Sequence, residues 1–318
     1  MADQNEVTII IPAYNEEASI GQVVENIKEQ MKRIDVRYEL IVVDDGSKDK
    51  TAEIAKAHHC RVIKQNRNLG YGASLKTGIL NARYEQIVIT DADGTYPPEN
   101  IPEIVEKLQN ADMVVGARIS QNVNIPLIRR FPKWILKKLA GYITGETIPD
   151  LNSGLRAFRK QFVLQYFSIL PDKFSFTTTI TVASLCDHYK VIYIPIDYHK
   201  RFGKSKIVPW DFVNFFNLVL RLSMLFNPLK VFIPVSFTFL FFGAGKFIMD
   251  IVVAFLRANE VSFSILTQQG VISTTALILL LSGLQILLIG MMSDGLGRKI
   301  EQRMPTEYKS HAFEEWED

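Results

Sequence analysis

The chain has 318 residues, and its 36 Lys and Arg residues nearly cancel its 34 Asp and Glu residues, which leaves a formal charge of +2. Such a balance argues against a protein held to nucleic acid by bulk charge. A hydrophobic share of 47% excludes a disordered chain. The two cysteines, Cys60 and Cys186, lie far apart and in no CxxC pattern, which argues against a disulfide scaffold and a structural zinc site.

Strand-like and helix-like segments alternate along the first part of the chain. The predicted strands are Val7–Ile11, Leu40–Asp44, Cys60–Lys64, Ile87–Thr90 and Met113–Gly116. The predicted helices are Ala18–Lys32, Thr51–His58, Gly72–Arg83 and Ile101–Gln109. Repeated βα units predict an α/β fold in which helices cover both faces of a mostly parallel sheet. Ligands bind at the carboxyl ends of such strands, so the segments that follow them form the candidate site.

The glycine patterns of two common nucleotide-binding folds are missing from the sequence. PAYNEE follows the first predicted strand, where a dinucleotide-binding fold has GxGxxG. The glycine-rich NLGYGASLKTG and the basic GKSK both lack the GxxxxGK[ST] spacing of a P-loop. A bound nucleotide must therefore be held by side chains.

The DADG segment carries the strongest chemical signal. Asp91 and Asp93 follow a predicted strand, and alternation along an extended chain points both side chains the same way. Two carboxylates this close repel each other unless a cation lies between them. Oxygen ligands in this number suit Mg²⁺ or Mn²⁺, with substrate phosphates completing the shell. The alternative is an Asx turn that begins a loop before Pro97 and Pro98.

Several motifs occur together in one order at βα spacing: IPAYNEE, VVDDGSKD, NLGYGASLKTG, DADG and SGLRAFRK. As a set, over roughly residues 5–210, they resemble the family 2 glycosyltransferases of the GT-A fold. RFGKSK and the apolar segments after it are similar to the polyprenyl-phosphate glycosyltransferases of the dolichyl-phosphate mannose synthase type. The resemblance implies a nucleotide-sugar donor, a divalent cation and a lipid monophosphate acceptor.

The same resemblance assigns the donor pocket to the first two motifs. Pro12, Tyr14 and Glu16 are expected to line the nucleotide pocket, and Asp44 or Asp45 to touch the base or ribose. A tyrosine ring offers a flat apolar face, and carboxylates accept hydrogen bonds from base N–H or ribose O–H groups. The alternative for the DDGS segment is a turn that caps the next helix.

The remaining predicted catalytic residues follow the third and fifth motifs and the last predicted strand. Asp91 and Asp93 become the metal-binding pair that assists departure of the nucleoside diphosphate. Arg118 and Arg156 are candidate phosphate clamps, because a guanidinium matches a phosphate in a bidentate way. The alternatives are a surface charge for Arg118 and a helix-end ion pair for Arg156.

Asp150 and Asn152 stand where the family places residues near the sugar and the acceptor. A lipid phosphate with a second pKa near 6 is already mostly an anion at pH 7, so the reaction does not require a general base. Asp150 is therefore expected either to orient the sugar or to be a plain turn residue.

The basic RFGKSK segment is a candidate seat for the lipid phosphate. Arg201 and Lys206 would hold the phosphate with Arg118, and Ser205 would add a hydrogen bond. The alternative is general attraction to anionic headgroups. The family often has an acidic residue just before the arginine, whereas this chain has Lys200 there.

Two apolar stretches, Val231–Phe255 and Val271–Met292, are each long enough to span a bilayer. Basic residues flank the pair on its outer sides, which predicts an integral membrane protein with both termini and the catalytic domain in the cytosol. Pro209–Asn227 has the composition of an interfacial helix, and a buried helix under the catalytic domain is the alternative. Lys246 and Asp250 are expected to pair in the membrane or to pack against a second subunit in a homo-oligomer.

These segments divide the chain into four predicted parts: the catalytic domain 1–208, the interfacial helix 209–228, the two-helix membrane region 229–293 and a cytosolic tail 294–318. The predicted activity is inverting transfer of a hexose to undecaprenyl or dolichyl phosphate. GDP-mannose is the preferred donor on resemblance alone, followed by UDP-glucose or a UDP-N-acetylhexosamine. The alternatives are a processive polysaccharide synthase, although the chain lacks QxxRW, and an inactive membrane-anchored accessory protein.

Overall fold

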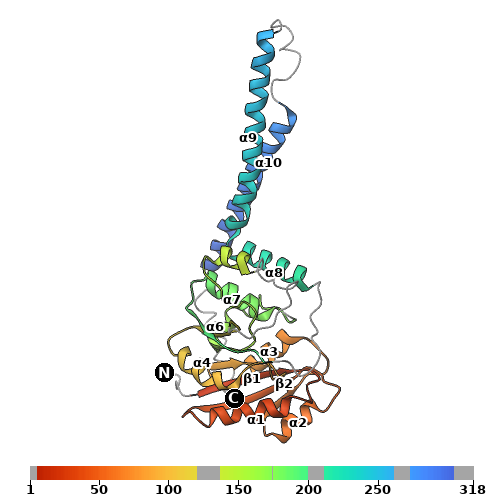
Figure 1. The fold of residues 1–318 in the computed structure, drawn as a ribbon, viewed down its shortest axis with the longest axis vertical. Helices are drawn as coiled ribbons and strands as arrows, with labels where there is room; N and C mark the ends of the chain where they lie inside the picture. The colour runs from red at the N-terminus through yellow and green to blue at the C-terminus, as the bar shows by residue number, and fades with distance from the viewer. Residues whose placement is uncertain (1–5, 120–136, 174, 200–210, 261–272, 304–318) are drawn as a thin grey trace. The chain divides into compact units, whose positions relative to one another are not determined.

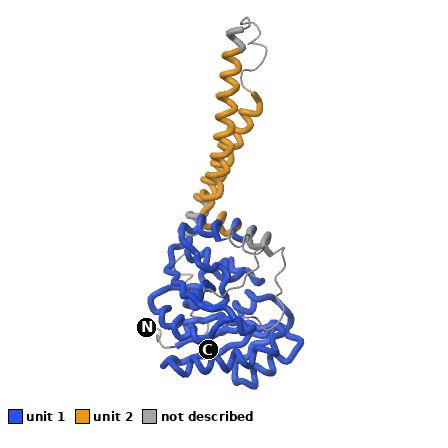
Figure 2. Tube along the Cα trace, viewed as in Figure 1, with its two compact units in different colours: residues 1–220 blue, residues 221–318 orange. Residues whose placement is uncertain are grey.

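The computed structural model describes residues 6–119, 137–173, 175–199, 211–260 and 273–303 (Figure 1). The chain forms two compact units, Met1–Leu220 and Arg221–Asp318 (Figure 2). The first unit carries the sheet and its covering helices, and the second carries two long helices.

A seven-stranded sheet forms the centre of the first unit. Its strands are β1 (Glu6–Ala13), β2 (Arg37–Asp44), β3 (Arg61–Lys64), β4 (Gln86–Ile89), β5 (Met113–Ala117), β6 (Arg156–Arg159) and β7 (Val191–Pro195). The strand order is β3-β2-β1-β4-β6-β5-β7, and every pairing is parallel except those of β6 with β4 and β5. The predicted α/β fold with a mostly parallel sheet is confirmed.

Helices cover both faces of this sheet (Figure 1). They are α1 (Ile20–Met31), α2 (Thr51–Ala57), α3 (Tyr71–Leu80), the 3₁₀ turn η1 (Pro98–Asn100), α4 (Ile101–Leu108), α6 (Lys160–Leu164) and α7 (Phe176–Cys186), and residues 137–144 are also helical. α1, α2 and α4 share one buried apolar cluster with the sheet. α3 and α7 lie on the other face, where Gly78 meets Ile10 and Arg156 bonds to α7.

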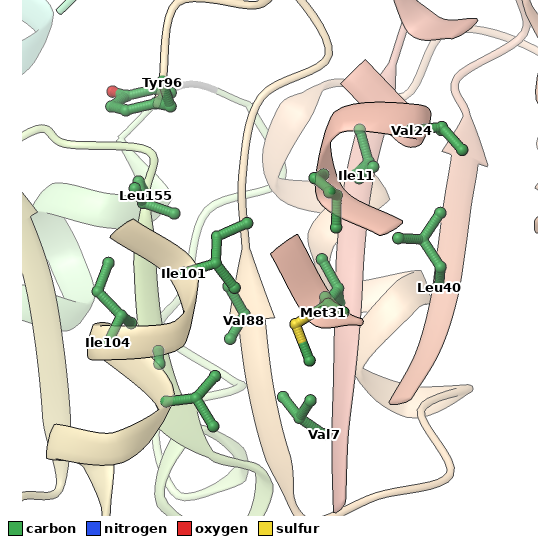
Figure 3. Close-up of a cluster of buried hydrophobic side chains, with 14 of the residues drawn as sticks. Val7, Ile11, Val24, Met31, Leu40, Val88, Tyr96, Ile101, Ile104 and Leu155 are labelled. Atoms are coloured by element: carbon green, nitrogen blue, oxygen red, sulfur yellow. The ribbon is translucent and has the colours of Figure 1, made fainter. Parts of the chain in front are cut away.

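The apolar cluster under α1 and α4 holds the strands in register (Figure 3). Val7 and Ile11 of β1, Val24 of α1, and Val88 of β4 are fully buried there with Ile104 of α4. Each such side chain contributes about 1.5–3 kcal/mol relative to an exposed one. β-Branched residues dominate the strands because they pack well on a pleated surface. The cluster therefore fixes where each strand ends.

The parallel register brings the ends of three strands to one edge of the sheet. Ala13 of β1 lies opposite Asp44 of β2, and Ile10 of β1 lies opposite Ile89 of β4. The segments that follow these strands begin at the same edge. This is the edge at which the sequence predicts the site.

The described chain continues in three helices: α8 (Asp211–Phe226), α9 (Pro228–Glu260) and α10 (Thr274–Arg303). α9 and α10 pack together, and the Ser236 hydroxyl donates to the Gly283 carbonyl oxygen at 2.7 Å. The predicted pairing of Lys246 with Asp250 is present, and Asp250 also accepts a hydrogen bond from the Ser273 backbone N–H at 2.9 Å.

Pro228–Leu256 and Thr274–Gly295 are long and apolar enough to cross a membrane. Only 6% and 17% of their most apolar windows are buried, so neither has the burial of a core helix in a soluble protein. The two predicted spans are therefore borne out as membrane-spanning candidates, each within a few residues of its expected bounds.

Candidate active site

The DADG loop follows β4, and its two carboxylates are held by local hydrogen bonds. Asp91 Oδ1 accepts a hydrogen bond from the Tyr71 hydroxyl at 2.9 Å. Asp93 is 7% exposed, and its Oδ1 accepts from the Thr95 backbone N–H at 3.1 Å and from the Thr95 hydroxyl at 2.6 Å. Gly94 turns the chain between them at φ +71°, a conformation that side chains rarely adopt. The loop therefore has a defined shape before any ligand binds.

A second loop, residues 150–154, packs directly on the first. Gly154 lies against Asp91 so closely that an added Cβ would be 2.8 Å from both carboxylate oxygens. The Gly154 backbone N–H donates to the Tyr96 hydroxyl at 2.6 Å. Only glycine allows this approach, so Gly154 brings the 150–154 loop to the predicted metal pair.

The loops after β1 and β2 brace each other where the nucleotide pocket is predicted. Pro12 is buried beside Val43 of β2, and Tyr14 and Glu16 are half-buried in the loop that follows. The Glu16 backbone N–H donates to the Thr51 hydroxyl at 2.9 Å. The three predicted pocket residues are thus fixed by contacts between the two loops.

Asp44 and Asp45, which the sequence could not distinguish, have different surroundings. Asp44 is fully buried, and its Oδ1 accepts from the Ser47 backbone N–H at 3.0 Å. Its Oδ2 is buried without a hydrogen-bond partner among the described residues. The carboxylate of Asp45 instead accepts from the backbone N–H groups of Leu69 at 2.7 Å and Gly70 at 2.9 Å. Asp44 is the better candidate for base or ribose, because Asp45 is engaged by the loop before α3.

Arg118 and Asp150 form a bidentate ion pair. Arg118 Nε lies 2.6 Å from Asp150 Oδ2 and its Nη2 lies 2.9 Å from Asp150 Oδ1. The two side chains are 19% and 11% exposed. Burial alone would raise the pKa of Asp150, but the hydrogen bonds and charge of Arg118 outweigh it and lower that pKa from 3.8 to about 2. The Arg118 guanidinium also lies 5.2 Å from the ring centre of Tyr198.

The predicted role of Arg156 as a phosphate clamp is wrong for this structure. Arg156 is completely buried, and burial lowers its pKa. Its Nε and Nη2 donate to the Ser153 carbonyl oxygen at 3.0 and 2.6 Å. Its Nη1 donates to the Thr177 carbonyl oxygen at 3.0 Å and to the Thr181 hydroxyl at 2.9 Å. The guanidinium therefore ties the 150–154 loop to α7. The expected alternative, a helix-end ion pair, is also absent from the bonds that the described residues make to Arg156.

The remaining predicted residues are either inside this loop or beyond the described ranges. Asn152 accepts a hydrogen bond from the Thr178 hydroxyl of α7 at 2.9 Å. Arg201, Ser205 and Lys206 lie outside the residues that the structure describes. The lipid-phosphate seat predicted for them stays a prediction.

Sequence reasoning missed three tyrosines that connect these loops. Tyr71 donates to Asp91, Tyr96 accepts from Gly154, and Tyr198 lies beneath Arg118 and contacts Tyr96 edge to face at 5.6 Å. Burial raises the pKa of Tyr71 well above its ordinary range, and Asp91 raises it further. Only the position of Tyr71 inside the NLGYGASLKTG motif could have drawn attention to it.

The residues present fit a divalent cation with oxygen ligands. No group of three or more His, Cys, Asp or Glu side chains that could hold a metal occurs in the part of the chain that the structure describes. A closed all-protein site is therefore disfavoured there. Two neighbouring carboxylates suit Mg²⁺ or Mn²⁺, which complete their shells with water and substrate phosphates. Asp91 and Asp93 are the residues that would hold the ion.

A cavity of about 260 Å³ lies behind the DADG loop, and its lining includes Asn26 and Gln30 of α1 with Gly94 and Tyr96. None of the predicted donor or acceptor residues lines it. The cavity is therefore separate from the pocket that the strand ends define.

Comparison with known proteins identifies the family. The family model described as Glycosyl transferase family 2 matches residues 8–167. A dolichyl-phosphate hexose transferase of Haloferax volcanii is 30% identical over 208 residues, 65% of this chain and 88% of that protein. An undecaprenyl-phosphate 4-deoxy-4-formamido-L-arabinose transferase of Photorhabdus laumondii is 29% identical over 301 residues, 92% of this chain and 89% of that protein. The chain belongs to glycosyltransferase family 2.

A solved structure shares the fold. Glucosyl-3-phosphoglycerate synthase from Mycobacterium tuberculosis, in complex with Mn²⁺, UDP-glucose and phosphoglyceric acid, superposes with a TM-score of 0.54 at 19% identity. The match covers 69% of this chain and 80% of that chain. It confirms the predicted GT-A fold.

Proposed function

We propose that this glycosyltransferase moves a sugar from a nucleoside-diphosphate sugar to a polyprenyl phosphate. One observation carries the proposal: the 150–154 loop touches both halves of the site. Gly154 packs on Asp91, and Asp150 holds Arg118. A carboxylate pair suited to a metal and diphosphate thus shares a loop with a positioned phosphate-binding cation. The acceptor type is supported by the two relatives that use dolichyl and undecaprenyl phosphate.

The donor half holds the nucleotide and its diphosphate. The buried Asp44 Oδ2, which has no hydrogen-bond partner in the described part of the chain, accepts from a base or ribose donor. Tyr14 and Pro12 line the same pocket, with Glu16 at its edge. A Mg²⁺ or Mn²⁺ ion held by Asp91 and Asp93 supplies charge stabilisation for the leaving diphosphate. The solved neighbour that contains Mn²⁺ and UDP-glucose supports this choice of ion.

The acceptor half presents Arg118 to the lipid phosphate. A guanidinium has five N–H donors, and Asp150 takes one from Nε and one from Nη2. Nη1 makes no hydrogen bond among the described residues and is available to a phosphate oxygen. Arg201, Ser205 and Lys206 are the further residues proposed for the lipid phosphate, on the sequence alone.

Asp150 positions Arg118 and is not a general base. Its pKa of about 2 makes it a very weak base at neutral pH. The lipid phosphate is already anionic, so its oxygen attacks the anomeric carbon without losing a proton to the protein. The new carbon–oxygen bond forms as the bond to the nucleoside diphosphate breaks on the opposite side. A single displacement of this kind inverts the anomeric configuration.

The proposed location is the cytosolic face of a membrane. Two helices span it, and basic residues on both outer flanks place the catalytic domain and both termini in the cytosol. The helix α8 lies at the interface in this proposal and the residues after 294 form a cytosolic tail. The apolar surface left on two spans per chain also supports a homo-oligomer.

The test incubates the purified full chain with polyprenyl phosphate, Mg²⁺ or Mn²⁺, and a panel of GDP-mannose, UDP-glucose and UDP-N-acetylhexosamines. Mass spectrometry of the lipids identifies the product, and Asp93→Ala is the matched loss-of-metal control. We expect one singly glycosylated lipid phosphate that depends on the metal and is lost in the control. GDP-mannose is the donor that the sequence favours.

Two results would overturn the proposal. A ladder of longer products would identify a processive synthase. Absence of product from every donor, with nucleotide binding intact, would identify an accessory protein that no longer reacts. Trypsin accessibility of the catalytic domain in sealed vesicles tests the proposed topology separately.

A further inference from the structure

The NLGYGASLKTG motif ends in α3, and its tyrosine reaches the predicted metal pair. Tyr71 is the first residue of α3, and its hydroxyl donates to Asp91 Oδ1 at 2.9 Å. The proposed reaction assigns Tyr71 no role. A phenol is a neutral donor at neutral pH, so this bond orients the carboxylate without cancelling its charge.

The backbone on both sides of Tyr71 is fixed by contacts from elsewhere in the fold. On one side, the buried carboxylate of Asp45 accepts from the Gly70 backbone N–H at 2.9 Å. On the other side, the backbone N–H groups of Gly72 and Ala73 donate to the carbonyl oxygens of Lys173 and Asp172 at 3.2 and 2.7 Å. The start of α3 is therefore clamped, and Tyr71 projects from a rigid base.

The opposite side of the Asp91 carboxylate is closed by Gly154. A Cβ at that position would come within 2.8 Å of both oxygens. Gly154 is itself held by the bond from its N–H to the Tyr96 hydroxyl at 2.6 Å. Asp91 thus lies between a hydroxyl donor and a backbone surface, which together limit how its carboxylate can rotate.

We propose that Tyr71 is a positioning residue for the metal site: its hydroxyl sets the orientation in which Asp91 binds the divalent cation of the donor complex. Asp45 acts one step further back, because it fixes the Gly70 backbone from which Tyr71 projects. This gives Asp45 a task that differs from the base or ribose contact expected from the sequence. The inference rests on the proposed function, since it needs a metal at Asp91 and Asp93.

Ligating carboxylates are commonly oriented by hydrogen bonds from a neighbouring group, and loss of such a bond costs about ten- to a hundredfold in metal affinity. Tyr71→Phe removes the hydroxyl and keeps the ring. We therefore expect Mn²⁺ to bind the variant about ten- to a hundredfold more weakly in the presence of UDP or GDP. We expect kcat to recover at saturating Mn²⁺, because the variant still folds the carboxylate pair into the site.

The experiment measures free Mn²⁺ by electron paramagnetic resonance while the full chain is titrated in detergent with the nucleoside diphosphate present, and it requires no turnover. The matched control is Tyr166→Phe, which removes a 2.6 Å bond from a tyrosine hydroxyl to Asp187. Tyr166 follows α6, and α6 follows the end of β6 that pairs with Gln86 at the start of β4. The control bond is thus at the sheet edge opposite the site.

Weaker Mn²⁺ binding in Tyr71→Phe with unchanged binding in Tyr166→Phe supports the proposal. Binding of both variants within twofold of the unmodified chain overturns it, and so does an equal loss in both, which would indicate general loosening of the fold. If the unmodified chain itself fails to bind Mn²⁺ with any nucleoside diphosphate, the metal-dependent function fails first and the role of Tyr71 fails with it.

Discussion

Replacement of Asp150 by asparagine tests the ion pair with Arg118 most directly. Asp150 has a pKa of about 2 in the folded chain against an ordinary 3.8. At about 1.4 kcal/mol per unit, the charged form contributes about 2 kcal/mol to the stability of the catalytic domain. The group is only 11% exposed, so solvent screening does not erase this value. Asp150→Asn should therefore lose about 2 kcal/mol at pH 7.

The sign of the pH dependence follows from the lowered pKa. The contribution is present above pH 4, where the carboxyl group is ionised in both the folded and unfolded chain, and it is lost as the pH falls toward 2. The difference in stability between the unmodified chain and Asp150→Asn should consequently be constant near neutrality and shrink below pH 4.

A thiol-reactive dye in detergent gives the assay, because both cysteines lie in the catalytic domain. Burial raises the pKa of the Cys60 thiol to about 11, so this residue reacts mainly after unfolding. For a domain of this size, about 2 kcal/mol shifts the unfolding midpoint by about 4–8 °C. The matched control is Asp172→Asn, which breaks the more exposed pair with Lys76 and should shift the midpoint far less.

The same variant separates positioning from base catalysis. If Asp150 positions Arg118, Asp150→Asn raises KM for the lipid phosphate and Arg118→Lys does the same. A midpoint within 1 °C of the unmodified chain would refute the energetic argument. A large fall in kcat with an unchanged KM for the lipid would refute the positioning role and restore Asp150 as a base.

Three further predictions follow from the geometry. Gly154→Ala should push the Asp91 carboxylate aside and weaken Mn²⁺ binding about ten- to a hundredfold, whereas Gly245→Ala, with nothing within 4 Å of the added carbon, should change nothing in the same titration. Arg156→Met should lower stability by about 3–5 kcal/mol in the thiol assay, because it strips partners from buried carbonyl groups; loss of donor binding without loss of stability would revive the phosphate clamp. The acidic limb of the rate profile should lie near pH 6 and follow the second pKa of the acceptor, so an acceptor analogue with a higher second pKa should move it and Asp150→Asn should not.

The sequence predicts the first half of the fold well because that half is made of local patterns. Each of the first five strands is a short β-branched or apolar run, and each is followed by a helix with clear apolar spacing, so β1–β5 and α1–α4 lie within a few residues of the prediction. The rule that ligands bind at the carboxyl ends of parallel strands then finds the DADG and DDGS loops without any knowledge of packing.

The second half is not predictable in the same way because its partners are remote. β6 is a four-residue strand, RAFR, that enters antiparallel between β4 and β5 and has no apolar run to reveal it. Without that strand, nothing in SGLRAFRK says that Arg156 faces α7 instead of the solvent. The pair Arg118–Asp150 spans 32 positions, and the bond from Tyr71 to Asp91 spans 20. No periodicity connects residues so far apart.

The misassignment of Arg156 points to how the two half-sites are coupled. Asp150 and Gly154 are four residues apart; one contacts the acceptor-side Arg118 and the other contacts the metal-side Asp91. Arg156 binds the carbonyl oxygen of Ser153, inside the same loop, through two N–H groups. A shift of this loop must therefore displace both half-sites at once. A change at Arg156 that leaves the domain folded would raise KM for donor and acceptor together, as a phosphate clamp would, although its guanidinium reaches neither. A change at Arg118, which reaches only the acceptor side, would raise one KM alone, so the two patterns separate a residue that touches phosphate from one that holds the loop.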